Sequence, residues 1–328
     1  MSEQASMLSA AAAGDFVLPF DISKAGVRGR FVRLDAASAQ ALDAHTLPEP
    51  AARVAGEALA LAALLGSALK LDGRLTVQTK GSGPLDLVTA DYYGSEPDRG
   101  SDAPDQGEDD EARSKDDGAR GVRGYARLDA ERFAALGDKF FAQLAGEGVL
   151  AITIEPQRGG KTYQGIVSLS PDGLAASAEI NFEQSEQLPT VIRLAAGPLY
   201  VAGKKTPRWR AAGLMLQMTP EASKAPGRSE DDWNRLSILA RSVEDLELLD
   251  TGLAPETVLW RLFHEDEVRV QPAEPVAFRC DCDTGRIVQI LRGYNADERA
   301  GLADDDGVIR ARCEFCGTTH EIGPDDLA

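Results

Sequence analysis

Hydrophobic and polar residues alternate along much of the first two hundred positions, a period-two pattern typical of half-buried β-strands. Residues 75–79 and 85–89 alternate on the two sides of a Gly-Ser-Gly-Pro turn, which predicts a β-hairpin. Residues 149–154 and 162–169 form a second predicted hairpin around a Gly-Gly turn. Further strands are predicted at residues 31–34, 121–127 and 189–194.

Helical patterns interrupt these strands in few places. Residues 48–70 are rich in Ala and Leu, but Arg53, Glu57 and Lys70 indicate a helix of a soluble protein rather than a membrane span. Shorter helices are predicted at residues 130–136 and 174–187. Because hairpins follow one another with few helices between them, the sequence predicts an α+β fold. We expect an amino-terminal body of antiparallel sheets with helices, not a doubly wound parallel sheet.

The carboxy-terminal third changes to helical spacing after a polar boundary at residues 221–232. Apolar residues recur every three or four positions from Leu236 to Leu249, which predicts one amphipathic helix that Gly252 ends. Pro255 begins a second predicted helix, which runs through Phe263. We therefore expect a core domain at residues 1–225, a helical linker at residues 226–272 and a small domain at residues 273–328.

Composition limits the classes of partner. The chain has 328 residues, of which 43% are hydrophobic, so it can bury a substantial core. Its 35 basic and 53 acidic residues give a formal charge of −18, which disfavours nucleic acid because phosphate binding requires a basic surface. We find neither a membrane span nor a signal peptide, and we expect a cytoplasmic protein without a membrane partner.

One segment of the chain differs from the rest in composition. Residues 95–120 contain ten acidic and four basic residues and no large apolar side chain. Such a segment buries too little apolar surface to offset the entropy lost on ordering. We therefore predict a disordered acidic insertion in the core domain, although a functional acidic tether is an alternative.

All four cysteines lie in the last 49 residues, as Cys280-Asp-Cys282 and, after thirty residues, Cys313-Glu-Phe-Cys316. A one-residue gap in extended chain directs both sulfurs to the same side, and a two-residue gap does so around a tight turn. Four thiolates in two close pairs can surround Zn²⁺ tetrahedrally. We therefore predict that Cys280, Cys282, Cys313 and Cys316 bind one zinc ion per chain. His320 has the spacing of a rival ligand, but with four cysteines available we interpret it as a bystander.

The segment that carries these cysteines has few large apolar side chains, and so short a chain seldom folds without a metal or disulfides. We expect zinc to hold it together, so that loss of the metal unfolds it. Thiolates are also the form of cysteine that oxidants attack, and each close pair is then free to form a disulfide. The same four residues can therefore act as a structural staple and as a reversible redox switch.

No catalytic motif accompanies the cysteines. Residues 158–162 resemble the end of a phosphate-binding loop, but Glu155 occupies the position of its first glycine. His45, His264 and His320 have no motif-like partners, and there is no Gly-x-Ser-x-Gly sequence. We therefore expect neither ATP use nor an enzyme, and no catalytic residues. A thiol–disulfide oxidoreductase and a zinc-stapled binding module, which oxidation merely inactivates, remain alternatives.

Several separate blocks of sequence resemble the heat shock protein 33 family, also called the 33 kDa chaperonin, a group of redox-regulated bacterial holdases. The resemblance spans nearly the whole chain. The blocks are Gln78-Thr-Lys-Gly-Ser-Gly-Pro-Leu85, Arg123-Gly-Tyr-Ala-Arg127, Tyr163-Gln-Gly-Ile-Val167, Gln184-Ser-Glu-Gln-Leu-Pro-Thr190, Ala212-Gly-Leu-Met-Leu-Gln217, Leu259-Trp-Arg-Leu-Phe-His-Glu265 and the two cysteine motifs. The acidic segment at residues 95–120 departs from the family, because it is longer than members usually carry there.

The resemblance implies a function and a mechanism. Cys280, Cys282, Cys313 and Cys316 would ligate zinc when reduced and form the disulfides Cys280–Cys282 and Cys313–Cys316 when oxidised. The zinc domain would then release the linker helices from the body, and unfolding client proteins would bind without ATP. The family also implies protection against aggregation under oxidative and heat stress, and a homodimer on oxidative activation. The resemblance does not identify the client-binding residues.

Overall fold

The computed structural model describes residues 14–69, 71, 73–94, 120–157, 160–200, 203, 207–224 and 228–327. Residues 95–119 of the predicted acidic insertion lie outside this set, so the prediction of disorder there stays a prediction. Its last residue, Arg120, begins a strand.

The strands and helices fall in the following order along the described residues. The strands are β1 (Phe16–Ile22), β2 (Val27–Leu34), β3 (Gly73–Gly81), β4 (Leu85–Tyr93), β5 (Arg120–Leu128), β6 (Gly148–Pro156), β7 (Tyr163–Ser168), β8 (Thr190–Leu199), β9 (Arg208–Met218), β10 (Val268–Val270), β11 (Glu274–Phe278), β12 (Ile309–Arg312) and β13 (Thr319–Ile322). The α-helices are α2 (Ala36–Asp43), α3 (Glu49–Ala68), α4 (Ala130–Ala134), α5 (Phe141–Ala145), α6 (Leu174–Asn181), α7 (Pro220–Ser223), α8 (Arg228–Arg241), α9 (Asp245–Leu249), α10 (Pro255–Phe263), α11 (Thr284–Arg292) and α12 (Ala296–Leu302). Short 3₁₀ turns η1 (Ser23–Ala25) and η3 (Pro324–Leu327) and a π-helical turn η2 (Phe182–Glu186) complete the set.

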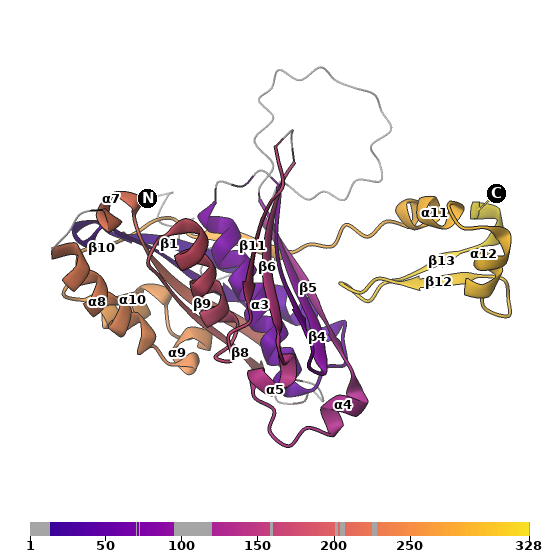
Figure 1. Cartoon of the computed structure of the whole chain (residues 1–328), viewed down its shortest axis with the longest axis horizontal. Helices are drawn as coiled ribbons and strands as arrows, with labels where there is room; N and C mark the ends of the chain where they lie inside the picture. Colours follow the sequence, from indigo (N-terminus) through magenta and orange to yellow (C-terminus); the bar gives the residue numbers. More distant parts are fainter. Residues whose placement is uncertain are drawn as a thin grey trace, which may run out of the picture.

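Ten strands of the body follow one another in one large sheet, in the order β7-β6-β3-β4-β5-β11-β1-β2-β9-β8, and β10 pairs with β1 beside this path. Every pairing is antiparallel except that of β11 with β5. β11 lies between β5 and β1 and therefore joins two halves of the sheet that the chain builds separately (Figure 1). The predicted α+β fold with antiparallel hairpins is confirmed.

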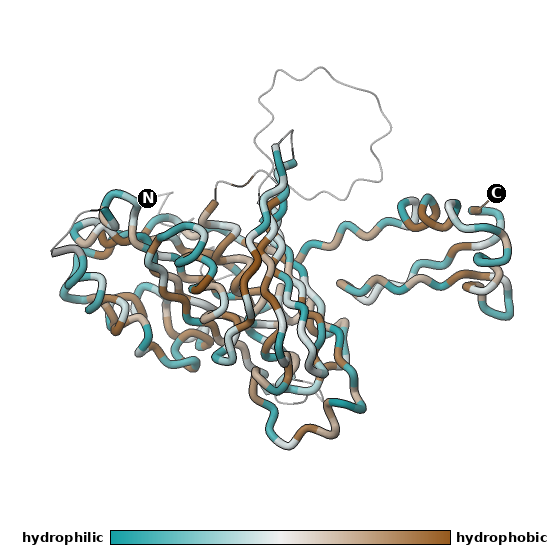
Figure 2. The backbone as a smooth tube through the Cα atoms, viewed as in Figure 1, coloured by the Kyte–Doolittle hydropathy of each residue, from teal (hydrophilic) through white to brown (hydrophobic). Residues whose placement is uncertain are grey.

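Helix α3 forms the centre of the body. It packs against strands of both halves of the sheet, and Leu59, Leu61 and Leu64 are fully buried there. Its length and apolar composition would allow it to cross a membrane, but most of the helix is buried inside the protein, as expected for a core helix. Figure 2 shows the same arrangement, with hydrophobic residues concentrated on α3 and the strands around it.

The other face of β1, β2, β9 and β8 is covered by helices α8, α9 and α10 (Figure 1). Leu236, Val243, Leu248, Leu259 and Phe263 from this helical segment are buried against that face. These helices therefore keep the apolar side chains of this sheet face, with which they form the second apolar cluster, away from solvent.

The helix predicted from Leu236 to Leu249 is wrong in one respect, because the structure divides it into α8 and α9. Glu244 adopts an extended conformation and caps α9, with its side chain and that of Glu247 bonded to each other's backbone N–H groups. This capping box starts a new helix where the apolar spacing alone continues the old one. Gly252 accordingly lies in a turn after α9, whereas Pro255 opens α10 as predicted.

The last fifty residues form a small module of α11, α12, the β12–β13 hairpin and η3. Its apolar cluster has three buried side chains among the described residues, Leu291, Ile309 and Ile322. An extended chain connects it to β11, and the β12–β13 turn points back toward β5 (Figure 1). So small an apolar cluster supplies little stability by itself.

Candidate metal and redox centre

The structure brings the four cysteines together from two separate parts of the chain. Cys280 and Cys282 follow β11 within four residues, and Cys313 and Cys316 lie in the turn between β12 and β13. The Sγ atoms of Cys280 and Cys313 are 3.6 Å apart, and those of Cys282 and Cys316 are 3.4 Å apart. All four Sγ atoms lie within 4.8 Å of one another.

Backbone hydrogen bonds shape the turn that carries the second pair. The N–H of Gly317 donates to the carbonyl of Cys313 (2.9 Å), and the N–H of Cys313 donates to the carbonyl of Thr318 (2.8 Å). Gly317 has a φ of 72°, a left-handed conformation that glycine adopts without the steric cost of a Cβ atom. The turn expected from the two-residue gap is therefore present and directs both sulfurs inward.

The dimensions of this cluster fit a tetrahedral metal site. Sulfurs that each lie 2.3 Å from a central Zn²⁺ are separated from one another by about 3.8 Å. The sulfur–sulfur distances of Cys282–Cys316 and Cys280–Cys313, 3.4 and 3.6 Å, are close to that value. All four side chains are half-buried, as expected for a site that shields its ligands from solvent but that small oxidants can reach.

The thiols differ in how readily they ionise without a metal. Burial and the neighbouring thiols of Cys316 and Cys313 raise the pKa of Cys280 to about 11, and burial with its neighbours raises the pKa of Cys282 further. Burial also acts on Cys316, but hydrogen bonds from Thr318 and from the Cys282 and Cys280 thiols outweigh it and lower its pKa to about 6. Without a metal, the Cys280 and Cys282 thiols therefore resist deprotonation, and a bound cation would favour their thiolate forms.

His320 lies on β13, outside the group of four cysteines. Its Nδ1 atom is 2.8 Å from the hydroxyl of Thr284. Its Nε2 atom is buried and has no hydrogen-bond partner among the described residues. The imidazole therefore supports the fold of the module beside the cluster rather than completing it.

Phe315, between the third and fourth cysteines, connects the cluster to the body. Its ring lies 4.0 Å below the guanidinium of Arg123 and meets the ring of Tyr125 edge-on, with centroids 5.0 Å apart. Arg312 adds a hydrogen bond from its Nη2 atom to the carbonyl of Ala44 (2.5 Å). Sequence reasoning missed this contact, although an aromatic residue between two ligands is a signal that could have suggested it.

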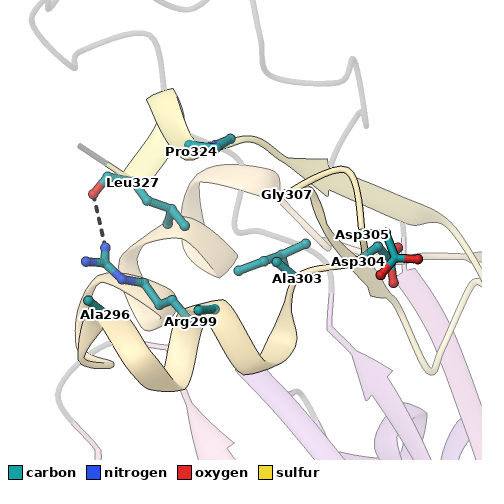
Figure 3. Close-up of a pocket in the computed structure, with 10 residues that line it drawn as sticks. Ala296, Arg299, Ala303, Asp304, Asp305, Gly307, Pro324 and Leu327 are labelled. Atoms are coloured by element: carbon teal, nitrogen blue, oxygen red, sulfur yellow. Dashed lines mark hydrogen bonds between the residues drawn. The ribbon is translucent and has the colours of Figure 1, made fainter.

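A separate depression of about 550 Å³ lies at the far end of the module. Figure 3 shows that it lies between α12, the loop of Asp304 and Asp305, and the end of the chain, where Arg299 donates a hydrogen bond to the carbonyl of Leu327 (3.2 Å). No cysteine or histidine lines it. It is therefore distinct from the sulfur cluster.

Comparison with known proteins agrees with the site and the fold. The profile of a protein family described as Hsp33 protein matches residues 15–323. The chain is 37% identical over 314 residues to the 33 kDa chaperonin of Caulobacter vibrioides, covering 94% of this chain and 95% of the relative. The chain belongs to the Hsp33 family. The 33 kDa chaperonin of Ectopseudomonas mendocina is 35% identical over 316 residues, covering 96% of this chain and 94% of the relative.

A solved structure shares the fold. It is described as the crystal structure of a 33 kDa chaperonin, heat shock protein 33 homolog, from Thermotoga maritima. Its TM-score is 0.72 at 20% sequence identity, with 96% of each chain covered. Membership of the Hsp33 family supports a chaperone function, and the four clustered cysteines are consistent with zinc binding and redox-active disulfides.

Proposed function

We propose that this protein is a redox-regulated, ATP-independent holdase of the reducing cytoplasm, and not an enzyme. The observation that carries the proposal is the cluster of four sulfurs within 4.8 Å, attached directly to β11 and, through Phe315, to β5. A change at the sulfurs is thereby transmitted to the strand that joins the two halves of the sheet.

Cys280, Cys282, Cys313 and Cys316 would hold one Zn²⁺ as thiolates in the reduced protein. The bound ion supplies folding free energy to a module that has three buried apolar side chains in its cluster. The chain's own contribution is the turn around Gly317 and the hydrogen bonds that Cys313 and Cys316 form with Thr318, which keep the sulfurs in position.

Oxidation would convert these ligands into the disulfides Cys280–Cys282 and Cys313–Cys316. In each pair two thiolates lose two electrons in total to one molecule of peroxide, which takes up two protons and leaves as two molecules of water. Disulfide sulfurs are no longer anionic ligands, so the module would lose its metal and unfold. A reductant would reverse the reaction.

Loss of the folded module would loosen β11 and the helices α8–α10 that precede it. These helices cover the apolar face of β1, β2, β9 and β8, and their departure would expose it. A large exposed apolar surface binds other proteins, and here we propose unfolded or partly folded clients. The same exposure would favour a homodimer of the oxidised chain.

Light scattering of thermally unfolding malate dehydrogenase tests the proposal. The reporter is heated with the reduced, zinc-loaded protein or with the peroxide-oxidised protein, in each case without ATP. We expect only the oxidised protein to suppress aggregation, a reductant to abolish the effect, and the oxidised chain to approach twice its monomer mass of 34.9 kDa.

Two other outcomes would replace the proposal. Equal suppression by both forms, or suppression by neither, would leave the four cysteines as the staple of a binding module that oxidation merely inactivates. Catalytic turnover of a disulfide substrate in the presence of a reductant would indicate a thiol–disulfide oxidoreductase.

A further inference from the structure

Three arginines face the helices that cover the sheet. Arg33 lies on β2, Arg193 on β8 and Arg210 on β9. Arg33 pairs with Ala212 across the ladder, and Arg193 pairs with Leu214. Since paired residues point to the same side of a sheet, all three arginines share the face of the second apolar cluster.

Each arginine donates to main-chain carbonyls of residues 243–253. Arg33 reaches the carbonyls of Leu248 (Nε, 2.9 Å) and Leu253 (Nη1, 3.1 Å). Arg193 and Arg210 reach those of Val243 and Leu249, both at 3.3 Å. Arg193 also contacts the carboxylate of Asp245 (3.2 Å), and Arg210 that of Asp35 (3.0 Å).

Two of the four acceptors, the carbonyls of Leu248 and Leu249, lie at the end of α9, whereas that of Val243 precedes the helix and that of Leu253 follows it. The last carbonyls of a helix have no intrahelical donor, and in α9 these include Leu248 and Leu249. The side chain of Leu248 is fully buried in the second apolar cluster. The sheet thus recognises α9 by the apolar side chains of Leu248 and Leu249 and by the main chain around them, features that many helix ends share.

Arg33 is an unusual residue to find at such a site. It is 2% exposed, forms no ion pair among the described residues, and its Nη2 atom has no partner there. The Nε atom of Arg193 is likewise buried without a partner in the described structure. These arginines therefore keep unpaired donor atoms while the linker covers them. A buried guanidinium usually has a carboxylate beside it.

We propose that Arg33, Arg193 and Arg210 form a carbonyl-binding row that holds the linker closed and later binds clients. Once the linker has left, the row takes the unpaired carbonyls at the ends of helices in partly unfolded proteins. α9 is the template for this partner: a helix end with free carbonyls and apolar side chains beside them. The inference rests on the proposed chaperone function and assigns client-binding residues to it.

A labelled peptide of residues 243–253 is the probe, and the oxidised full-length protein is titrated into it by fluorescence anisotropy. The variants are Arg193→Lys and Arg210→Lys, which keep the positive charge but lose the forked donor group. Arg28→Lys is the matched control, because Arg28 is an exposed residue of β2 on the opposite face. Circular dichroism and melting temperature establish that each variant folds.

We expect each of the two variants to bind the peptide about tenfold more weakly, as for the loss of one hydrogen bond to a charged group, and the control to bind normally. In the reduced protein the same two variants should exchange the amide hydrogens of α9 faster. Equal affinity of wild type and both variants for the peptide would overturn the proposal, because the surface would then act through apolar contact alone.

A second peptide, with Asp245 changed to Asn, requires only the wild-type protein, because Asp245 is the carboxylate of this segment that contacts Arg193. Recognition of carbonyls predicts unchanged affinity, whereas a tenfold loss would show that the row pairs with carboxylates and would refute the proposal. Failure of the wild type to bind either peptide while it still suppresses aggregation would overturn this inference and leave the holdase intact. Failure in both assays would overturn the proposed function with it.

Discussion

Phe315 joins the sulfur cluster to the body through two weak but directional contacts. A cation–π contact and an edge-on aromatic pair are together worth about 1–3 kcal/mol, comparable with a sizeable fraction of the stability of a small domain. Phe315 is not a ligand, so its contacts determine how firmly the module docks without determining whether the cluster forms.

Replacing Phe315 by Ala should therefore leave the cluster intact but lower the peroxide concentration that activates the protein. The undocked module opens more often, which exposes the cysteines. The measurement is a peroxide titration followed by release of zinc to a chromogenic chelator. Tyr294→Ala, a change at an exposed aromatic of the same module, serves as the control. An unchanged titration curve for Phe315→Ala would show that docking has no part in the switch.

The ligand assignment makes a separate prediction. Changing both Cys313 and Cys316 to Ser removes half of the sulfurs, so the purified chain should no longer retain zinc, as measured by elemental analysis. His320→Ala, in contrast, should retain one zinc ion per chain. Full occupancy in the double-serine variant would disprove the assignment, and loss of zinc from the histidine variant would make His320 a ligand.

Spacing in the sequence was sufficient to predict that the four cysteines lie together, because local geometry directs the two sulfurs of each close pair to the same side. The partners of Phe315 could not be predicted in this way. Arg123 and Tyr125 lie far from it in the chain, and their contact depends on how the module docks. Likewise, the arginine row consists of residues from three strands whose proximity follows only from the order β2-β9-β8.

At the scale of the element, α3 carries an acidic residue in an apolar environment. Burial raises the pKa of Glu57 to about 7. Asp245 of α9 acts in the same direction, whereas Arg53 on the same helix and Arg193 on β8 oppose it. The folded chain therefore binds more protons than the unfolded chain between about pH 4.5 and pH 7.

The free energy of unfolding should fall as the pH rises through this window, by up to roughly 3 kcal/mol from this residue. Glu57→Gln should abolish that part of the pH dependence and be more stable than wild type at pH 8. Urea unfolding of the reduced, zinc-loaded protein at pH 5 and pH 8 measures the effect. Glu49→Gln, at the exposed start of the same helix, is the control. A parallel decline in Glu57→Gln and wild type would assign the pH dependence to other groups.

Local patterns predicted most of the strands and helices of the body because each has a clear period and a turn at its ends. They failed at the junction of α8 and α9, where apolar spacing continues but the capping box of Glu244 restarts the helix. They also gave no sign of β11, a five-residue strand that includes Pro275 and is fixed by pairing with both β1 and β5. A short strand that is fixed by pairing with distant segments need not show a periodic pattern of hydrophobic residues.

At the scale of the whole molecule, the three apolar clusters differ greatly in size. The central cluster around α3 and the cluster beneath α8–α10 each contain many buried side chains, whereas the cluster of the carboxy-terminal module has three among the described residues. The body can therefore stay folded under conditions in which the module cannot. The proposed switch requires this difference in stability, because the module that unfolds must be less stable than the body that then binds clients.

Removal of zinc from the reduced protein by a chelator should consequently unfold the module and leave the body folded. Hydrogen exchange followed by mass spectrometry should show loss of protection in α11, β12 and β13, with α3 and the strands around it unchanged. Peptides from α8–α10 should also gain exchange, to a smaller extent than the module, because loosening of β11 beyond them weakens their packing on the sheet. The double-serine variant, which already lacks the metal, is the control and should not change on adding the chelator. Retained protection in the module would mean that its three buried side chains are sufficient to fold it, and oxidation would then need another route to the linker.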